Sequence, residues 1–94
     1  GKKTNEKIWP LPLDDDFKKQ IESEIADMRN IGGRPGGTIT AAMFLKEFVG
    51  NTPWAHNDIA GTAILNERKP YAAKGGSGFG VRLLLEFLEK QAGL

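Results

Sequence analysis

The chain has 94 residues, of which 39% are hydrophobic and 27% are charged, a balance typical of globular rather than disordered proteins. The formal net charge is only +1 and the basic residues are scattered, so neither a nucleic-acid surface nor a membrane surface is indicated. The absence of cysteine excludes disulfides and thiolate zinc sites. No apolar run approaches the roughly 20 residues of a membrane span. One domain at most is therefore expected over residues 1–94, and the start at Gly1 suggests a chain processed or cut from something longer.

The first predicted helix begins at three aspartates. Residues 14–16 supply an N-cap and negative charge for the N-terminus of a helix. Apolar side chains then recur every three or four residues, at Phe17, Ile21, Ile25 and Met28. This spacing predicts an amphipathic helix that continues to Met28 and buries one face.

The segment from Gly32 to Gly37 is rich in glycine and must be a loop with positive φ angles or close backbone approach. A helix follows, with apolar residues at Ile39, Ala42, Met43, Leu45, Phe48 and Val49. They nearly encircle the helix, which predicts burial on most sides. The N–H groups of the loop, with Arg34, could bind an anion at the helix N-terminus, although the Lys-Ser/Thr pair of a P-loop is missing. A tight turn is the simpler interpretation.

Residues 54–59 are the best candidate for a strand, and residues 7–9 are a weaker one. The pattern of residues 81–88 predicts a last amphipathic helix. This order predicts an α/β protein with about three helices and one or two sheet strands. So few strands leave backbone N–H and C=O groups unpaired, which is costly when they are buried. The chain is therefore expected to be part of a larger sheet and incomplete on its own.

His56 and Asp58 are the most conspicuous polar residues of the predicted strand. Side chains alternate along a strand, so these two would point to the same face and could begin a metal site. A catalytic metal usually takes at least three protein ligands, and the chain has no other histidine. Two structural, hydrogen-bonded side chains are the favoured interpretation, with a metal pair as the alternative. Ligands of open α/β sheets lie beyond the carboxyl ends of the strands, so the small residues 60–63 could form a pocket wall.

Several motifs then occur in an order that resembles the cytosolic leucyl aminopeptidase family. They are WPLPL at 9–13, DMRNIGG at 27–33, GTITAA at 37–42, WAH at 54–56, DIAGTA at 58–63 and GFGVR at 78–82. The resemblance covers nearly the whole chain. It is a resemblance to the C-terminal part of the family's catalytic domain only, which implies part of a three-layer αβα sandwich of the zinc-exopeptidase type.

The resemblance also implies an activity. Members of the family are metalloproteases that remove N-terminal residues, often Leu, from peptides. They are cytoplasmic homohexamers with two divalent ions, zinc or manganese. Their metal ligands and their catalytic Lys and Arg precede the matched stretch, and their Asn-Thr-Asp-Ala-Glu-Gly-Arg signature is absent here. No catalytic or metal-binding residue is therefore carried over, and the chain alone is expected to bind no metal and to be inactive.

Three substrate-binding positions are carried over by the resemblance. Ala60 and Ala63 match positions that line the pocket for the N-terminal side chain of the substrate, and Ile31 matches one that lines the pocket for the next residue. Some relatives carry Met at the position of Ala63, which implies a roomier pocket here. The implied partners are a peptide substrate, the remainder of the catalytic domain and identical subunits, with no nucleic acid and no membrane. A small anion-binding or interaction module that uses Gly32–Gly37 and Arg34 is the alternative.

Overall fold

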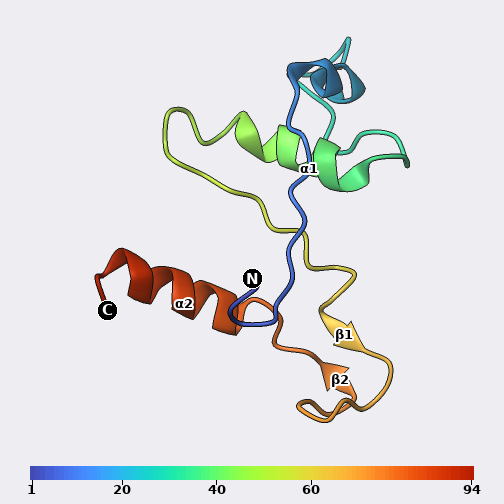
Figure 1. Ribbon diagram of the computed structural model, residues 1–94. Helices are drawn as coiled ribbons and strands as arrows, with labels where there is room; N and C mark the ends of the chain where they lie inside the picture. Colours follow the sequence, from blue (N-terminus) through green and yellow to red (C-terminus); the bar gives the residue numbers. More distant parts are fainter. The chain divides into compact units, whose positions relative to one another are not determined.

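The computed structural model describes all residues 1–94 and divides them into two compact units. The helical unit is formed by Pro10–Asn57, and the split unit joins Gly1–Trp9 to Asp58–Leu94 (Figure 1). In chain order the elements are the 3-10 helix η1 (Asp15–Ile21), α1 (Gly37–Lys46), β1 (Ile64–Leu65), β2 (Gly75–Gly76) and α2 (Val81–Gln91). The fold is thus mixed α/β with three helices and a two-stranded sheet, as the sequence predicts at this coarse level.

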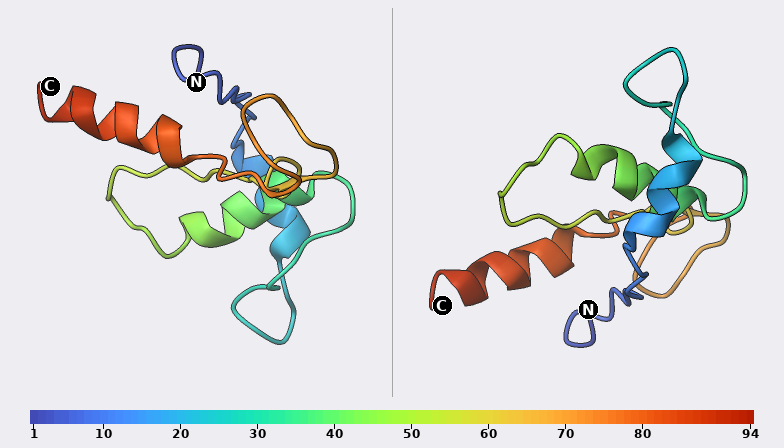
Figure 2. Two further views of the ribbon diagram at one scale, coloured as in Figure 1. Left: turned by 90° about the horizontal axis from the view of Figure 1, so that it is seen from below. Right: turned by 90° about the horizontal axis from the view of Figure 1, so that it is seen from above.

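The core of the helical unit lies between η1 and α1, which pack side by side in both views of Figure 2. Ile21 of η1 and Met43 of α1 are each 1% exposed, and Ala42 and Thr40 of α1 are also buried. Burying a large apolar side chain contributes roughly 1.5–3 kcal/mol. Contact between these few side chains therefore supplies most of the stability of this unit.

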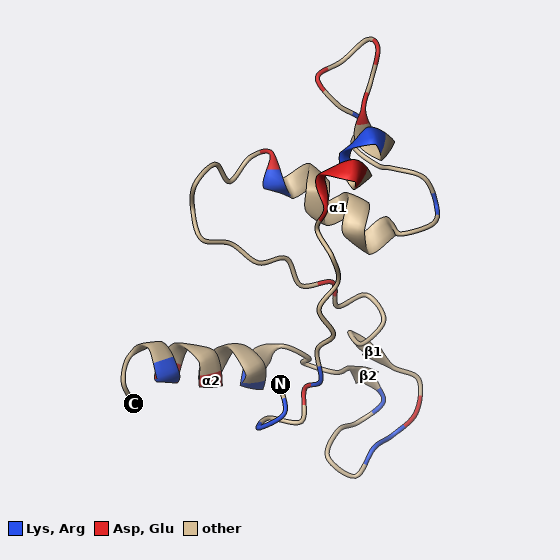
Figure 3. Ribbon diagram, turned by 45° about the horizontal axis from the view of Figure 1, so that its top comes forward, with Lys and Arg blue, Asp and Glu red and all other residues tan.

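Ion pairs accompany that apolar contact. Nζ of Lys18 lies 2.8 Å from Oε1 of Glu47, and Nζ of Lys46 lies 3.1 Å from Oδ1 of Asp15. Figure 3 shows the arrangement: the first turn of η1 is acidic and its last turn is basic, as the helix dipole favours. Because all four side chains are partly exposed, each pair adds little to stability.

The start of η1 follows the prediction. The side chain of Asp14 accepts a hydrogen bond from the backbone N–H of Asp16 at 2.9 Å, so it caps the helix. This bond satisfies one of the N–H groups that have no partner within the helix.

The end of η1 does not follow the prediction, because the helix stops at Ile21 instead of continuing to Met28. The hydroxyl of Ser23 accepts hydrogen bonds from the backbone N–H groups of Ile25 at 3.3 Å and Ala26 at 3.2 Å. Such side-chain bonds give the backbone an alternative to helical hydrogen bonding. Ile25 is consequently 98% exposed, although its spacing places it on the apolar face.

The glycine-rich loop before α1 has both features that its composition predicts. Gly36 has a φ of 68°, in the left-handed region that favours glycine. A Cβ atom on Gly32 would lie only 2.8 Å from Cγ2 of Thr40, which is buried. The loop backbone therefore approaches α1 too closely for any larger residue at position 32.

The burial of α1 is narrower than predicted. The helix forms as expected, but its buried residues are confined to Thr40, Ala42 and Met43. Leu45 is 40% exposed and Phe48, just beyond the helix, is 69% exposed. One face of α1 is covered by η1, and no other element of the helical unit covers the rest.

The predicted strand at residues 54–59 is not formed, and neither is the weaker candidate at residues 7–9. No neighbouring strand is present to accept their backbone hydrogen bonds, and without pairing a strand has no ladder. The sheet that does form is small and antiparallel, with Ile64 opposite Gly76 and Leu65 opposite Gly75. Its two strands lie side by side in Figure 1.

The last predicted helix is confirmed as α2. It begins after Gly80, which has a φ of 100° and no side chain to cap the helix. None of its residues is buried, and five of its apolar side chains are each more than half exposed, at Val81, Leu84, Leu85, Phe87 and Leu88. No helix of the structure combines the length and the apolarity that crossing a membrane requires.

Candidate functional site

Two of the predicted substrate-binding residues, Ala60 and Ala63, lie in one turn of the split unit, the 59–63 turn. The carbonyl oxygen of Ile59 accepts hydrogen bonds from the backbone N–H groups of Thr62 at 2.9 Å and Ala63 at 2.8 Å. The carboxylate of Asp58 accepts another from the N–H of Ala60 at 2.9 Å. The turn is thus closed by its own backbone. Ala60 is exposed and Ala63 half-buried, and each presents only a methyl group.

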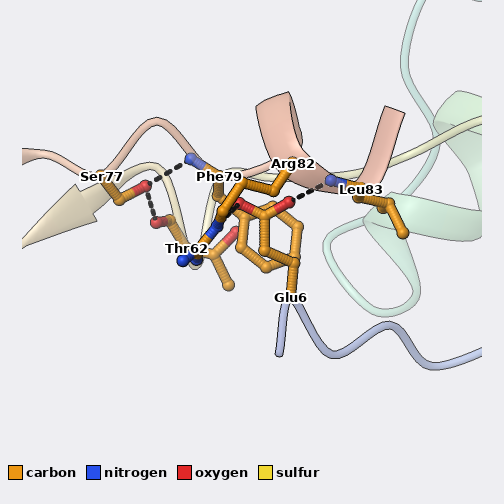
Figure 4. A network of polar contacts seen from close by, with 6 residues as sticks. All are labelled: Glu6, Thr62, Ser77, Phe79, Arg82 and Leu83. Atoms are coloured by element: carbon orange, nitrogen blue, oxygen red, sulfur yellow. Dashed lines mark hydrogen bonds and ion pairs between the residues drawn. The ribbon is translucent and has the colours of Figure 1, made fainter. Parts of the chain in front are cut away.

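Ser77 connects the 59–63 turn to the segment that leads into α2 (Figure 4). Its hydroxyl donates a hydrogen bond to the carbonyl oxygen of Thr62 at 2.6 Å and accepts one from the N–H of Phe79 at 3.1 Å. Its backbone N–H donates to the carbonyl oxygen of Ala63 at 2.8 Å. The last bond continues the β1–β2 pairing by one residue. The two carbonyl groups at the end of the turn are therefore both held by one serine.

Glu6 holds the other end of this lead-in. Its carboxylate accepts a hydrogen bond from the backbone N–H of Leu83 at 2.7 Å, and Nε of Arg82 lies 3.4 Å from its other oxygen (Figure 4). Leu83 is the third residue of α2, so Glu6 acts as an N-cap supplied from the opposite end of the chain. Glu6 is only 3% exposed.

The pKa of Glu6 reflects two opposing effects. Burial raises the pKa, because desolvation disfavours the charged carboxylate. Hydrogen bonds from the N–H of Leu83, from Arg82 and from the N–H of Gly80, with the charge of Arg82, lower it and prevail. The pKa of Glu6 is consequently held below its ordinary value of 4.5, and the group is ionised at neutral pH.

A surface hollow of about 400 Å³ lies in the split unit beside these contacts. Its lining includes Glu6, Thr62, Ser77 and Phe79, together with Arg82, whose guanidinium carbon lies 6.0 Å from the centre of the Tyr71 ring. Ala60 and Ala63 do not line it, whereas Gly61 and Thr62 between them do. The 59–63 turn therefore contributes to this hollow through different residues from those that match the substrate pocket.

Ile31, the third predicted substrate-binding residue, belongs to the helical unit and is 81% exposed. Ala60 and Ala63 belong to the split unit. The grouping of all three residues around one substrate stays a prediction.

The structure gives His56 and Asp58 structural contacts. The ring of His56 lies 6.2 Å from that of Trp54, between centroids, and Asp58 caps the 59–63 turn through Ala60. Nowhere in the chain do three or more His, Cys, Asp or Glu side chains gather so that they could hold a metal ion. The residues of this chain do not fit a metal site.

The glycine-rich loop is explained by packing. Its left-handed Gly36 and the close approach of Gly32 to Thr40 account for its composition. No observation favours an anion site at Gly32–Gly37 and Arg34.

Comparison with known proteins decides the family. Residues 1–85 match the cytosol aminopeptidase family, catalytic domain. The chain belongs to this family. The probable cytosol aminopeptidase of Koribacter versatilis is 60% identical over 88 residues, which is 94% of this chain and 17% of the relative. That of Geobacter sp. strain M21 is 54% identical over 91 residues, 97% of this chain and 18% of the relative. That of Cenarchaeum symbiosum is 53% identical over 96 residues, 98% of this chain and 20% of the relative.

These matches confirm the resemblance inferred from the motifs. They also show that the chain spans 17% to 20% of the length of these cytosol aminopeptidases. The sequence motifs identified Ala60 and Ala63 within the family pattern, but they predicted neither the turn that holds these residues nor the roles of Ser77 and Glu6. Ser77 precedes a predicted helix, a position where serine commonly bonds to the backbone, so its sequence context offered a local indication. Glu6 offered none, because its partner lies 77 residues away.

Proposed function

We propose that this chain is the C-terminal part of the catalytic domain of a cytoplasmic, metal-dependent aminopeptidase that removes N-terminal residues, often leucine, from peptides. The observation that carries the proposal is the match of residues 1–85 to the catalytic domain of the cytosol aminopeptidase family. Relatives at 53% to 60% identity, named as probable cytosol aminopeptidases, support it.

In this proposal the chain forms walls of the substrate pocket and performs no chemistry itself. Ala60 and Ala63 border the N-terminal side chain of the peptide, and Ile31 borders the following residue. The 59–63 turn suits this task, since hydrogen bonds within it define its shape and its two alanines present methyl groups. An apolar substrate side chain gains binding energy by leaving water for such a surface.

The two divalent ions, zinc or manganese, belong to the remainder of the catalytic domain. No residue set of this chain could hold them. The same remainder would supply the other strands of an αβα sandwich, and the full-length enzyme would assemble as a homohexamer.

The surface of α2 supports docking onto that remainder. Val81, Leu84, Leu85 and Leu88 are each more than half exposed, although their hydrophobicity suits a buried helix face. Contiguous exposed apolar side chains of this kind mark interaction surfaces. The remainder of the catalytic domain is the proposed occupant, because the chain spans only 17% of the length of its Koribacter relative.

A segment replacement tests the proposed function. The matching segment of the Koribacter versatilis relative is exchanged for this chain, which gives what we call the replacement enzyme. Hydrolysis of leucine amide is measured with zinc and with manganese. We expect metal-dependent turnover from the replacement enzyme and none from the relative truncated before the segment. A folded, metal-loaded replacement enzyme without turnover would contradict the proposal.

A further inference from the structure

The two alanines of the 59–63 turn have no polar side chain that could hold the turn against the rest of the split unit. Ala60 and Ala63 have only methyl groups. The Ile59 carbonyl accepts hydrogen bonds from within the turn, among them one from the Thr62 hydroxyl at 3.2 Å, and the Asp58 carboxylate accepts one from the N–H of Ala60. These bonds define the shape of the turn. The placement of the turn must therefore depend on contacts with other segments.

Ser77 supplies those contacts. Three hydrogen bonds meet at this residue: its hydroxyl donates to Thr62 at 2.6 Å, its N–H donates to Ala63 at 2.8 Å, and its hydroxyl accepts from Phe79 at 3.1 Å. The hydroxyl is thus both donor and acceptor, which fixes its orientation. Ser77 is half-buried, and its bond with Phe79 is partly shielded from water.

The segment that contacts the Ser77 hydroxyl is itself held in place by Glu6. Phe79, which donates to the Ser77 hydroxyl, lies one residue before Gly80, the N-cap residue of α2. Glu6 is buried and also holds Leu83 in the first turn of α2. The sequence of contacts runs from the buried carboxylate to the α2 lead-in, then to the serine hydroxyl and the end of the 59–63 turn (Figure 4).

We propose that Ser77 is a positioning residue that determines specificity: it holds the end of the 59–63 turn and so sets how closely Ala60 and Ala63 approach the N-terminal side chain of the substrate. This inference rests on the proposed function. Its physical basis is that a pocket discriminates between side chains only when its walls are held in place. Loss of the hydroxyl lets the turn shift while every other wall stays intact.

The test compares Ser77→Ala, which removes the hydroxyl, with Ser77→Thr, which keeps it, in the replacement enzyme. Ser23→Ala is the matched control, because the Ser23 hydroxyl likewise makes two hydrogen bonds to backbone groups but belongs to the helical unit. The first readout is the ratio of kcat/KM for leucine amide to kcat/KM for alanine amide. For Ser77→Ala we expect this ratio to move toward one by about threefold to tenfold, mainly through KM, the range expected for losing one or two hydrogen bonds. Ser77→Thr and the control should retain the original ratio.

Hydrogen exchange of the peptide that covers residues 59–65 is the second readout. Faster exchange there in Ser77→Ala, but not in Ser77→Thr, supports the positioning role. Unchanged exchange overturns it, whether or not the enzyme is active. Faster exchange with an unchanged selectivity ratio overturns the role in specificity. A replacement enzyme that is inactive even with Ser77 present contradicts the proposed function instead, and the exchange measurement still decides whether Ser77 holds the turn.

Discussion

The carboxylate of Glu6 accepts a hydrogen bond of 2.7 Å from the backbone N–H of Leu83, across 77 positions of sequence. Gly80, at the N-cap of α2, has no side chain that could serve this N–H. The helix therefore obtains its cap from the first residues of the chain. Together with the Glu6–Arg82 and Lys3–Glu86 ion pairs, this contact joins the two sequence segments of the split unit, and it explains why a carboxylate is buried there.

The free energy of unfolding should depend on pH through the hydrogen bond between Glu6 and Leu83. Because the folded-state pKa of Glu6 is lowered, the ionised group stabilises the folded chain fully above 4.5, its ordinary value. That contribution is lost as the pH falls through the lower folded-state pKa. In Glu6→Gln the neutral side chain cannot titrate. We expect the stability difference between wild type and variant, measured by urea denaturation, to shrink below pH 4.5. A difference that stays constant down to pH 2 would rule out this role.

Gly32→Ala should destabilise the helical unit. The new Cβ would meet Cγ2 of Thr40 at 2.8 Å, closer than van der Waals contact allows. Overpacking of this kind costs about 1–3 kcal/mol of unfolding free energy. Gly37→Ala is the control, since nothing lies within 4 Å of its Cβ position, and it should be neutral or slightly stabilising. Equal midpoints of denaturation for the two variants would count against the close approach.

Ile21 and Ile25 have the same place in the apolar sequence pattern but opposite environments. Ile21 is 1% exposed and Ile25 is 98% exposed. We expect Ile21→Ala to lower the unfolding free energy by about 2–5 kcal/mol, the usual range for a buried isoleucine. Ile25→Ala should change it by less than about 0.5 kcal/mol, as surface substitutions do. Similar losses for both variants in chemical denaturation would mean that the helix continues past Ile21 after all.

The chain by itself should have no peptidase activity. Its His, Cys, Asp and Glu side chains form no group that could hold a metal ion. We expect no hydrolysis of leucine amide by the purified chain, with or without added zinc or manganese. Turnover that depends on the added metal would refute this expectation and would require His56 and Asp58 to be reconsidered as ligands.

Ala63→Met should narrow the proposed pocket of the replacement enzyme. The longer side chain would occupy space otherwise available to the N-terminal side chain of the peptide. We expect kcat/KM for leucine amide to fall by about tenfold relative to alanine amide, since one or two methylene groups change discrimination by this order. Ala73→Met, at an exposed position of the split unit, is the control. Equal effects on both substrates would argue against Ala63 as a pocket wall.

Local sequence patterns predicted the elements whose causes are local. The apolar periodicity located α1 and α2, the aspartates located the start of η1, and the glycines located the turn before α1. The same patterns failed where a competing contact decided the outcome. Ser23 ended η1 early by bonding to the N–H groups that a longer helix would use. Residues 54–59 formed no strand, because a strand depends on a partner that local sequence does not reveal.

The candidate site was likewise predictable only where its features depend on contiguous residues. Family motifs located Ala60 and Ala63, since that information lies in contiguous residues. The β1–β2 pairing was missed because each strand has only two residues. Strand β2 is moreover a pair of glycines, which have low strand propensity. Glu6 was missed because capping from 77 positions away follows from the tertiary fold alone.

The division of the chain also fixes the order in which its parts can acquire structure during synthesis. The helical unit is one continuous stretch, Pro10–Asn57, and can fold once that stretch has left the ribosome. The split unit forms later, because residues 1–9 precede the helical unit in the chain whereas α2 follows it. Until then Glu6 has no helix to cap, and the N-terminal segment remains open to chaperones and proteases. Joining the two segments of the split unit closes a long loop, which carries an entropic cost.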